Sequence, residues 1–288
     1  MGGGSWTTAS YCSYAASTGR TFDTKKGVLS DNFDSAQELF KSRSLDPELN
    51  PKNVIRECCD SKEHPNTIPV ILALDVTGSM GDTSIEIAKK LNKIMTDLYK
   101  DVKDVEFLIM GIGDLAYDDF PIQASQFESD IRIAEQLDKI YFEAGGGGNS
   151  YESYTAAWLF GARHTKLDSW KRGKKGLIIT IGDEEINPYL PKNPLKRSLN
   201  EPLQKDIDTK DLYNEVKDKY DLYHLNVTST STGKRGKVKN VESFAAVIGN
   251  QNVSNVTTEN ITDKIINIVK DFAAKTDNII TEGKAISW

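Results

Sequence analysis

The sequence has few of the residues that build disulfide frameworks or transition-metal sites. Cysteine and histidine occur three times each in 288 residues, at Cys12, Cys58, Cys59, His64, His164 and His224. Cys58 and Cys59 are adjacent, which is a poor arrangement for a disulfide framework. A zinc site needs about four ligands at finger-like spacing, which this set does not supply. We therefore expect reduced thiols, and histidines that are packed or on the surface.

The sequence also lacks the run of roughly 18 apolar residues that a membrane span requires. Its first residues, MGGGSWTTASYCSYAAS, have neither the basic start nor the apolar stretch of a signal peptide, so a cytoplasmic location is expected. Acidic residues outnumber basic ones by 42 to 36, which gives a formal net charge of −6. Because this charge repels phosphate groups, we expect neither nucleic acid nor a membrane as partner.

Residue composition and the pattern of apolar residues divide the chain into three parts. Residues 1–66 are rich in turn residues, as in LDPELNPKN, and are interpreted as an N-terminal arm with one short helix at 35–42. The run IPVILALDV then begins a region of alternating strands and helices, expected over 67–276. Residues 277–288 are expected to form a C-terminal tail.

Continuous apolar runs predict strands that are covered on both faces, as in a parallel sheet flanked by helices. The expected strands are 68–76, 105–113, 120–127, 176–182, 220–227 and 245–248. The expected helices are 84–99, 129–140, 151–164, 209–219 and 260–275, the first with an apolar stripe at Ile87, Leu91, Ile94 and Leu98. The short link after the second strand favours an antiparallel edge pair. The sequence therefore predicts an α/β, Rossmann-like fold: an open, mostly parallel six-stranded sheet with one antiparallel edge strand and helices on both faces.

Oxygen-bearing side chains follow the predicted strands. The first strand ends in DVTGSMGD, which places Asp75, Thr77 and Ser79 at alternate positions, and the strand GLIITIG is followed by Asp183. A third loop, EAGGGGNSYES, carries Asn149 after four glycines. In open sheets of this kind ligands bind at the carboxyl ends of the strands. Oxygen ligands without clustered His or Cys suit a hard cation such as Mg²⁺, with Mn²⁺ or Ca²⁺ as alternatives, and leave a coordination position open.

The run ALDVTGSMGD resembles the D-x-[S/T]-x-S signature of the metal-ion-dependent adhesion site (MIDAS) of von Willebrand factor A (vWA) domains. The GGGGN loop and the IGDEE strand end stand where that family places its other two metal loops. The resemblance implies a vWA fold with its first and fourth strands side by side. It also implies that Thr77 and Ser79 are direct ligands and that Asp75 and Asp183 act directly or through water. Asn149 stands in the place of the family's usual threonine, with Ser150 as the alternative.

A further resemblance is to bacterial and phage-encoded stand-alone vWA proteins, carried by EHPNTIPVILALDVTGSMG, PIQASQFESD, GGGGNSYESY and ARHT. The expected function is a non-enzymatic module in which Mg²⁺ bridges to an Asp or Glu of a protein partner. As the family resemblance implies, that partner is a multiprotein assembly or an AAA-type ATPase. The alternatives are a metal-dependent hydrolase using Asp75, Asp183 and Glu184, and a structural subunit, for example of a phage particle, with a vestigial site. The insert 187–206 is interpreted either as a disordered loop or as a rim over the metal face.

Overall fold

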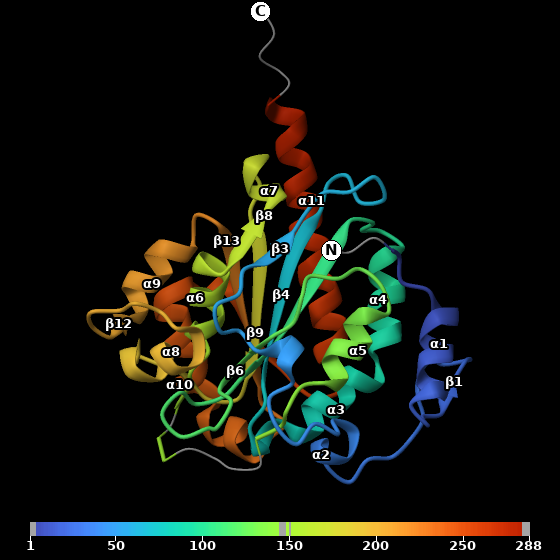
Figure 1. Cartoon of the computed structure of the whole chain (residues 1–288), viewed down its shortest axis with the longest axis horizontal. Helices are drawn as coiled ribbons and strands as arrows, with labels where there is room; N and C mark the ends of the chain where they lie inside the picture. Colours follow the sequence, from blue (N-terminus) through green and yellow to red (C-terminus); the bar gives the residue numbers. More distant parts are fainter. Residues whose placement is uncertain (1–3, 144–147, 150, 284–288) are drawn as a thin grey trace, which may run out of the picture.

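A six-stranded sheet forms the centre of the molecule, with helices on both sides (Figure 1). The computed structural model describes residues 4–143, 148–149 and 151–283. The strands lie in the order β14-β13-β9-β4-β5-β6, and their bounds are β4 Ile68–Asp75, β5 Val105–Ile112, β6 Ile122–Ala124, β9 Gly176–Gly182, β13 Tyr220–Val227 and β14 Val253–Val256. Neighbouring strands are parallel except β5 and β6. The predicted α/β architecture around a mostly parallel sheet is confirmed.

The sheet is buried on both faces because its central strands are apolar throughout. In β4, Leu72 and Leu74 pack into one core, whereas Ile71 and Ala73 pack into the other. Side chains alternate across a strand, so a continuous apolar run serves two layers of helices. β4 pairs with β9, so the first and fourth strands of the sheet lie side by side, as the family resemblance implies.

The first layer of helices consists of α3 Gly81–Lys89, α4 Leu91–Tyr99, α5 Arg132–Asp138 and α11 Ile261–Gly283. The predicted stripe Ile87, Leu91, Ile94 and Leu98 is buried. One helix was predicted over this stretch, but the backbone departs from helical geometry at Lys90 (φ −96°, ψ 5°), which divides it into α3 and α4. Within the described residues, no helix is long and apolar enough to cross a membrane.

The second layer consists of α6 Thr155–Arg163, α8 Lys192–Leu199, α9 Thr209–Val216 and α10 Ser231–Ile248. The strand predicted at 245–248 is wrong: these residues end α10, and the last strand is β14. The insert 187–206 is not a disordered loop. It folds into β11 (Tyr189–Leu190) and α8, and Leu190, Leu195 and Leu199 are buried in the core of this layer.

Within the described residues, four two-stranded sheets accompany the central sheet, and the sequence did not predict them. They join β1 Phe22–Asp23 to β2 Val28–Leu29, β3 Arg56–Cys58 to β8 Thr165–Leu167, β7 Tyr151–Glu152 to β10 Glu185–Ile186, and β11 to β12 Ile207–Asp208. The remaining short helices are α2 Ala36–Leu39, η1 Pro47–Leu49, η2 Gly78–Met80, α7 Asp168–Lys171 and η3 Asn250–Asn252. The third strand of the central sheet, β6, is shorter than the predicted 120–127.

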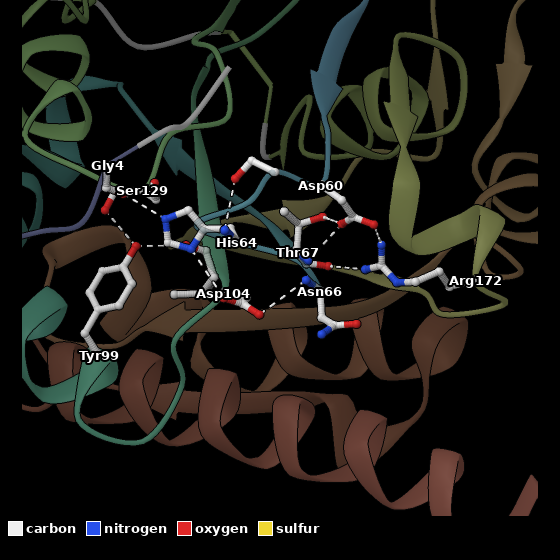
Figure 2. A network of polar contacts seen from close by, with 11 residues as sticks. Gly4, Asp60, His64, Asn66, Thr67, Tyr99, Asp104, Ser129 and Arg172 are labelled. Carbon is white, nitrogen blue, oxygen red and sulfur yellow. Dashed lines mark hydrogen bonds and ion pairs between the residues drawn. The ribbon is translucent and has the colours of Figure 1, made fainter. Parts of the chain in front are cut away.

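The first part of the segment before β4 packs against the first helix layer, whereas Cys58 of β3 lies in the core of the second layer. The segment begins with a helix absent from the prediction, α1 Thr8–Ser17, and Trp6 and Tyr11 join the buried core of the first layer. Figure 2 shows Gly4 held beyond the amino ends of β4 and β5, where its carbonyl accepts hydrogen bonds from His64 Nε2 at 2.8 Å and Ser129 Oγ at 2.6 Å. At the other end of the chain, α11 extends to Gly283, beyond the predicted start of the tail; residues 284–288 lie outside the described residues.

Candidate metal centre

The carboxyl ends of β4, β9 and β13 lie side by side at one edge of the sheet, because these strands are parallel neighbours. β4 ends in Asp75 and β9 is followed directly by Asp183. The short helix η2 follows β4 and carries Ser79, while Thr77 precedes it. Four of the five predicted metal ligands therefore stand on two adjacent strand ends, at the edge where open sheets bind ligands.

Asp75 is fully buried and its carboxylate accepts three hydrogen bonds. Thr77 donates to Oδ1 twice, from its backbone nitrogen at 2.9 Å and from its hydroxyl at 2.6 Å. The hydroxyl of Tyr154, on the other side, donates to Oδ2 at 2.8 Å. The turn after β4 is thereby folded back over the aspartate.

Asp183 is also fully buried and connects three segments. Its Oδ1 accepts a hydrogen bond from Ser79 Oγ at 3.1 Å, and its Oδ2 accepts one from Thr230 Oγ1 at 2.5 Å. Asn240 of α10 donates to its backbone carbonyl at 2.6 Å. Since Ser79 belongs to the loop after β4, its hydrogen bond joins the two metal loops that the sequence predicts.

Burial disfavours the charged form of both aspartates. Burial and the nearby charge of Asp183 raise the pKa of Asp75 to about 7, although hydrogen bonds from Thr77 and Tyr154 act in the opposite direction. Burial raises the pKa of Asp183, against the hydrogen bonds of Thr230 and Ser79. Because two neighbouring buried carboxylates cannot both ionise without compensation, the pair would be stabilised by a cation.

The donor set fits a hard divalent cation. Two carboxylates and the hydroxyls of Thr77, Ser79 and Thr230 supply oxygen atoms only, which Mg²⁺ prefers over nitrogen and sulfur. Within the described part of the chain, no group of three or more His, Cys, Asp or Glu residues is placed to hold a metal ion. A cation at this edge would therefore depend on hydroxyl groups and water as well as on the two aspartates.

Asn149, the fifth predicted ligand, makes its contact elsewhere in the structure. Its Nδ2 donates to Asp114 Oδ2 at 2.5 Å, in the loop that follows β5. Among the described residues, no hydrogen bond joins Asn149 to the four ligands above. Its role as a ligand remains a prediction. Ser150 and residues 145–147 of the glycine loop lie outside the described residues.

Tyr154 and Thr230 are site residues that the sequence analysis missed. Tyr154 stands within the predicted helix 151–164, where nothing marks it as a site residue, yet its hydroxyl reaches Asp75. A Cβ atom at Gly182 would overlap that hydroxyl, so glycine is needed there for the close approach. Thr230 belongs to a hydroxyl-rich run, TSTST, directly after β13. The strand-end rule that selected Asp75 and Asp183 applies to this run too, because β13 is the neighbour of β9.

Comparison with solved structures finds a similar fold in a bacterial pilus adhesin. The pilus adhesin SpaC from Lactobacillus rhamnosus GG, in its open conformation, matches with a TM-score of 0.50 and 12% identity, over 78% of this chain and 31% of the adhesin. A second crystal form gives the same TM-score and identity over 32% of the adhesin. The vWF domain of the type V pili tip protein Mfa5 from Porphyromonas gingivalis has a TM-score of 0.49 and 10% identity, over 73% of this chain and 96% of that chain.

These similarities are limited to the fold. The chain spans about a third of the length of the SpaC adhesin, and at 12% identity nothing about activity carries over. No family model and no curated protein matches the sequence. Taken with the strand order of the central sheet, the structural match to SpaC supports an α/β fold around a mostly parallel sheet.

Proposed function

We propose that this chain is a protein-binding module that holds one Mg²⁺ ion and uses it to bind a carboxylate of a protein partner. The observation that carries the proposal is the buried pair Asp75 and Asp183, joined by hydroxyl groups at the carboxyl edge of the sheet. A pair of this kind is costly to ionise alone and is stabilised by a divalent cation.

Each residue has a defined part in this proposal. Thr77 and Ser79 offer hydroxyl oxygens directly, and Asp75 and Asp183 supply negative charge, directly or through water. Tyr154 fixes the orientation of Asp75, and Thr230 fixes that of Asp183. The bound ion supplies a positive centre with an open position, to which an Asp or Glu of the partner binds.

The proposed chemistry requires a protein partner that offers an Asp or Glu side chain to the ion. SpaC is a pilus adhesin by its description, and an adhesion-type binding role is proposed here for this chain. We propose as partner a multiprotein assembly or an AAA-type ATPase. We also propose a cytoplasmic location for the chain. Nucleic acid and membranes are not proposed, because the net charge of −6 repels both.

A metal-dependent hydrolase is the second candidate, and one observation favours it. Burial and the charge of Asp183 raise the pKa of Glu184 to about 7, which suits a general base. The histidine closest to Tyr154, His224, is wholly buried and stacked on Phe244, and burial lowers its pKa to about 3. It is therefore no proton donor near neutral pH, and binding is the better supported function.

Removal of Asp75 tests the proposal. Asp75→Ala is expected to lower the affinity for Mg²⁺ by more than about 100-fold, because the loss of an outer group alone costs 10–100-fold. Isothermal titration calorimetry with MgCl₂ measures this loss. Asp82→Ala is the matched control, because Asp82 is exposed in the first turn of α3, a few residues from the site.

The binding role is tested by capture of host proteins in the presence of MgCl₂ or EDTA. A partner captured by the wild type and by Asp82→Ala should be lost with EDTA and with Asp75→Ala. Equal capture in all four samples contradicts a metal bridge. A chain that stays associated with large particles despite Asp75→Ala would instead be a structural subunit, and turnover of phosphoester or peptide substrates with Mg²⁺ or Mn²⁺ would indicate the hydrolase.

A further inference from the structure

Glu152 is a buried carboxylate at the same edge of the sheet that none of the contacts above explains. It is 3% exposed, and its Oε2 has no hydrogen-bond partner. A buried carboxylate oxygen without a donor costs free energy unless a cation or an ordered water satisfies it. The position of Glu152 therefore needs a partner that protein groups do not supply.

The backbone places Glu152 between two of the strand ends. It lies in β7, which pairs in parallel with β10 so that Glu152 stands opposite Ile186, just after Asp183. On the other side, Ser153 donates its backbone nitrogen to Gly113 at the end of β5, at 3.3 Å. β4 lies between β5 and β9 in the sheet, so Glu152 is held across the end of the strand that carries Asp75.

The charged groups that act most strongly on Glu152 are all acids. Burial raises the pKa of Glu152, and the charges of Asp75, Asp118, Glu184 and Asp114 raise it further. Two of these have their own partners: Asp114 accepts from Asn149 and from the backbone of Ala116 at 2.7 Å, and Asp118 accepts from the backbone of Asp114 at 2.6 Å. Among the described residues, no hydrogen-bond donor at Glu152 Oε2 offsets the effect of these acids.

We propose that Glu152 is a positioning residue for the bound cation, accepting hydrogen bonds from water molecules that the ion retains. The inference rests on the proposed metal site and adds to it a residue outside the predicted ligand set. Mg²⁺ loses its water reluctantly and keeps several molecules when protein-bound. Carboxylates that receive hydrogen bonds from such water fix the ion's coordination and contribute to its affinity.

Glu152→Gln tests this role, because glutamine keeps the size of the side chain and removes its charge. Titration calorimetry at pH 7.5 should show Mg²⁺ affinity about 10–100-fold weaker than that of the wild type. Glu185→Gln is the matched control: Glu185 stands in the neighbouring strand β10, and its charge is paired with Lys239 at 2.7 Å. Its affinity for Mg²⁺ should equal that of the wild type.

The outcomes separate this inference from the proposed function. If the wild type binds Mg²⁺ and the affinity of Glu152→Gln is within twofold of the wild-type affinity, the role of Glu152 is overturned and the metal site stands. A wild type that takes up no Mg²⁺ overturns both. If Glu152→Gln does not fold by circular dichroism, Glu152→Asp, which keeps the charge but withdraws it by one methylene, should bind Mg²⁺ at least fivefold more weakly, and equal binding again overturns the inference.

Discussion

At the scale of single residues, the hydrogen bonds of the buried polar groups in the site do not compensate for the free-energy cost of burying their charge. Asp75 accepts three hydrogen bonds, all of which favour its charged form. Burial and the charge of Asp183 outweigh them, and the pKa of Asp75 rises to about 7. The network therefore orients the carboxylate but leaves its charge uncompensated, which is what a cation site requires before the cation binds.

This imbalance predicts a dependence of stability on pH in the absence of metal. The ordinary pKa of the Asp75 carboxyl is 3.8 and its folded-state value is about 7. Between these values the folded protein keeps a proton that the unfolded chain has lost, so the free energy of unfolding falls as pH rises from about 4 to about 7. Asp75→Asn does not titrate and should lack this component.

Urea unfolding in EDTA at several values between pH 4 and pH 8.5 measures the effect. Between about pH 4 and pH 7, the free energy of unfolding of the wild type should fall relative to that of Asp75→Asn. Above about pH 7, the difference between the two proteins should stay constant. Addition of MgCl₂ at pH 8 should stabilise the wild type and leave Asp75→Asn unchanged, because only a competent site gains from ligand binding. A difference between the two proteins that is constant with pH would contradict the coupling.

A site residue could be predicted only where the neighbouring sequence indicates its role. Asp75 and Asp183 directly follow apolar runs, and the strand-end rule therefore selects them. Tyr154 resembles any core aromatic in the sequence, since only the tertiary fold brings its hydroxyl to Asp75. Thr230 was open to the same rule as the aspartates, but without a carboxylate the run TSTST resembled an ordinary turn.

At the scale of elements, the apolar runs were the most reliable signals. β9 and β13 begin and end where the apolar runs of the sequence do, because most residues of these two strands are buried in the sheet. α10 was missed because its first half, STGKRGKVK, contains two glycines and four basic residues, and the buried face includes Gly233 and Asn240. Asn240 donates a hydrogen bond to the backbone of Asp183 and does not join a purely apolar core, so no hydrophobic period marks this half of the helix.

The insert is an element whose packing gives a direct prediction. Leu195 of α8 is fully buried in the core of the second helix layer. Leu195→Ala should lower the free energy of unfolding by about 2–5 kcal/mol, as for other large-to-small changes in cores. Lys196→Ala, one residue along on the exposed side of the same helix, should change it by less than about 0.5 kcal/mol.

Chemical denaturation of the two variants distinguishes a packed helix from a mobile loop. Equal stability of Leu195→Ala and Lys196→Ala would show that the insert does not contribute to the core. Mg²⁺ affinity should be the same in both folded variants, because neither residue is among the candidate ligands.

At the scale of the whole molecule, the two edges of the sheet have different roles. Beyond the amino ends of the strands, Arg172 contacts Asp60, and His64 lies between Asp104 and the carbonyl of Gly4 (Figure 2). At the carboxyl ends, Asp75, Asp183 and Glu152 are buried. One edge therefore fixes the N-terminal segment to the body, and the other carries the candidate metal site.

The most direct measurement of the central claim is anomalous X-ray diffraction from crystals grown with MnCl₂, in which Mn²⁺ replaces Mg²⁺ and is located by its own signal. The account predicts one strong anomalous peak per chain, within coordination distance of the hydroxyl oxygens of Thr77 and Ser79 and beside Asp75 and Asp183. A map with no peak among these four side chains, at Mn²⁺ concentrations that saturate protein sites, would contradict it.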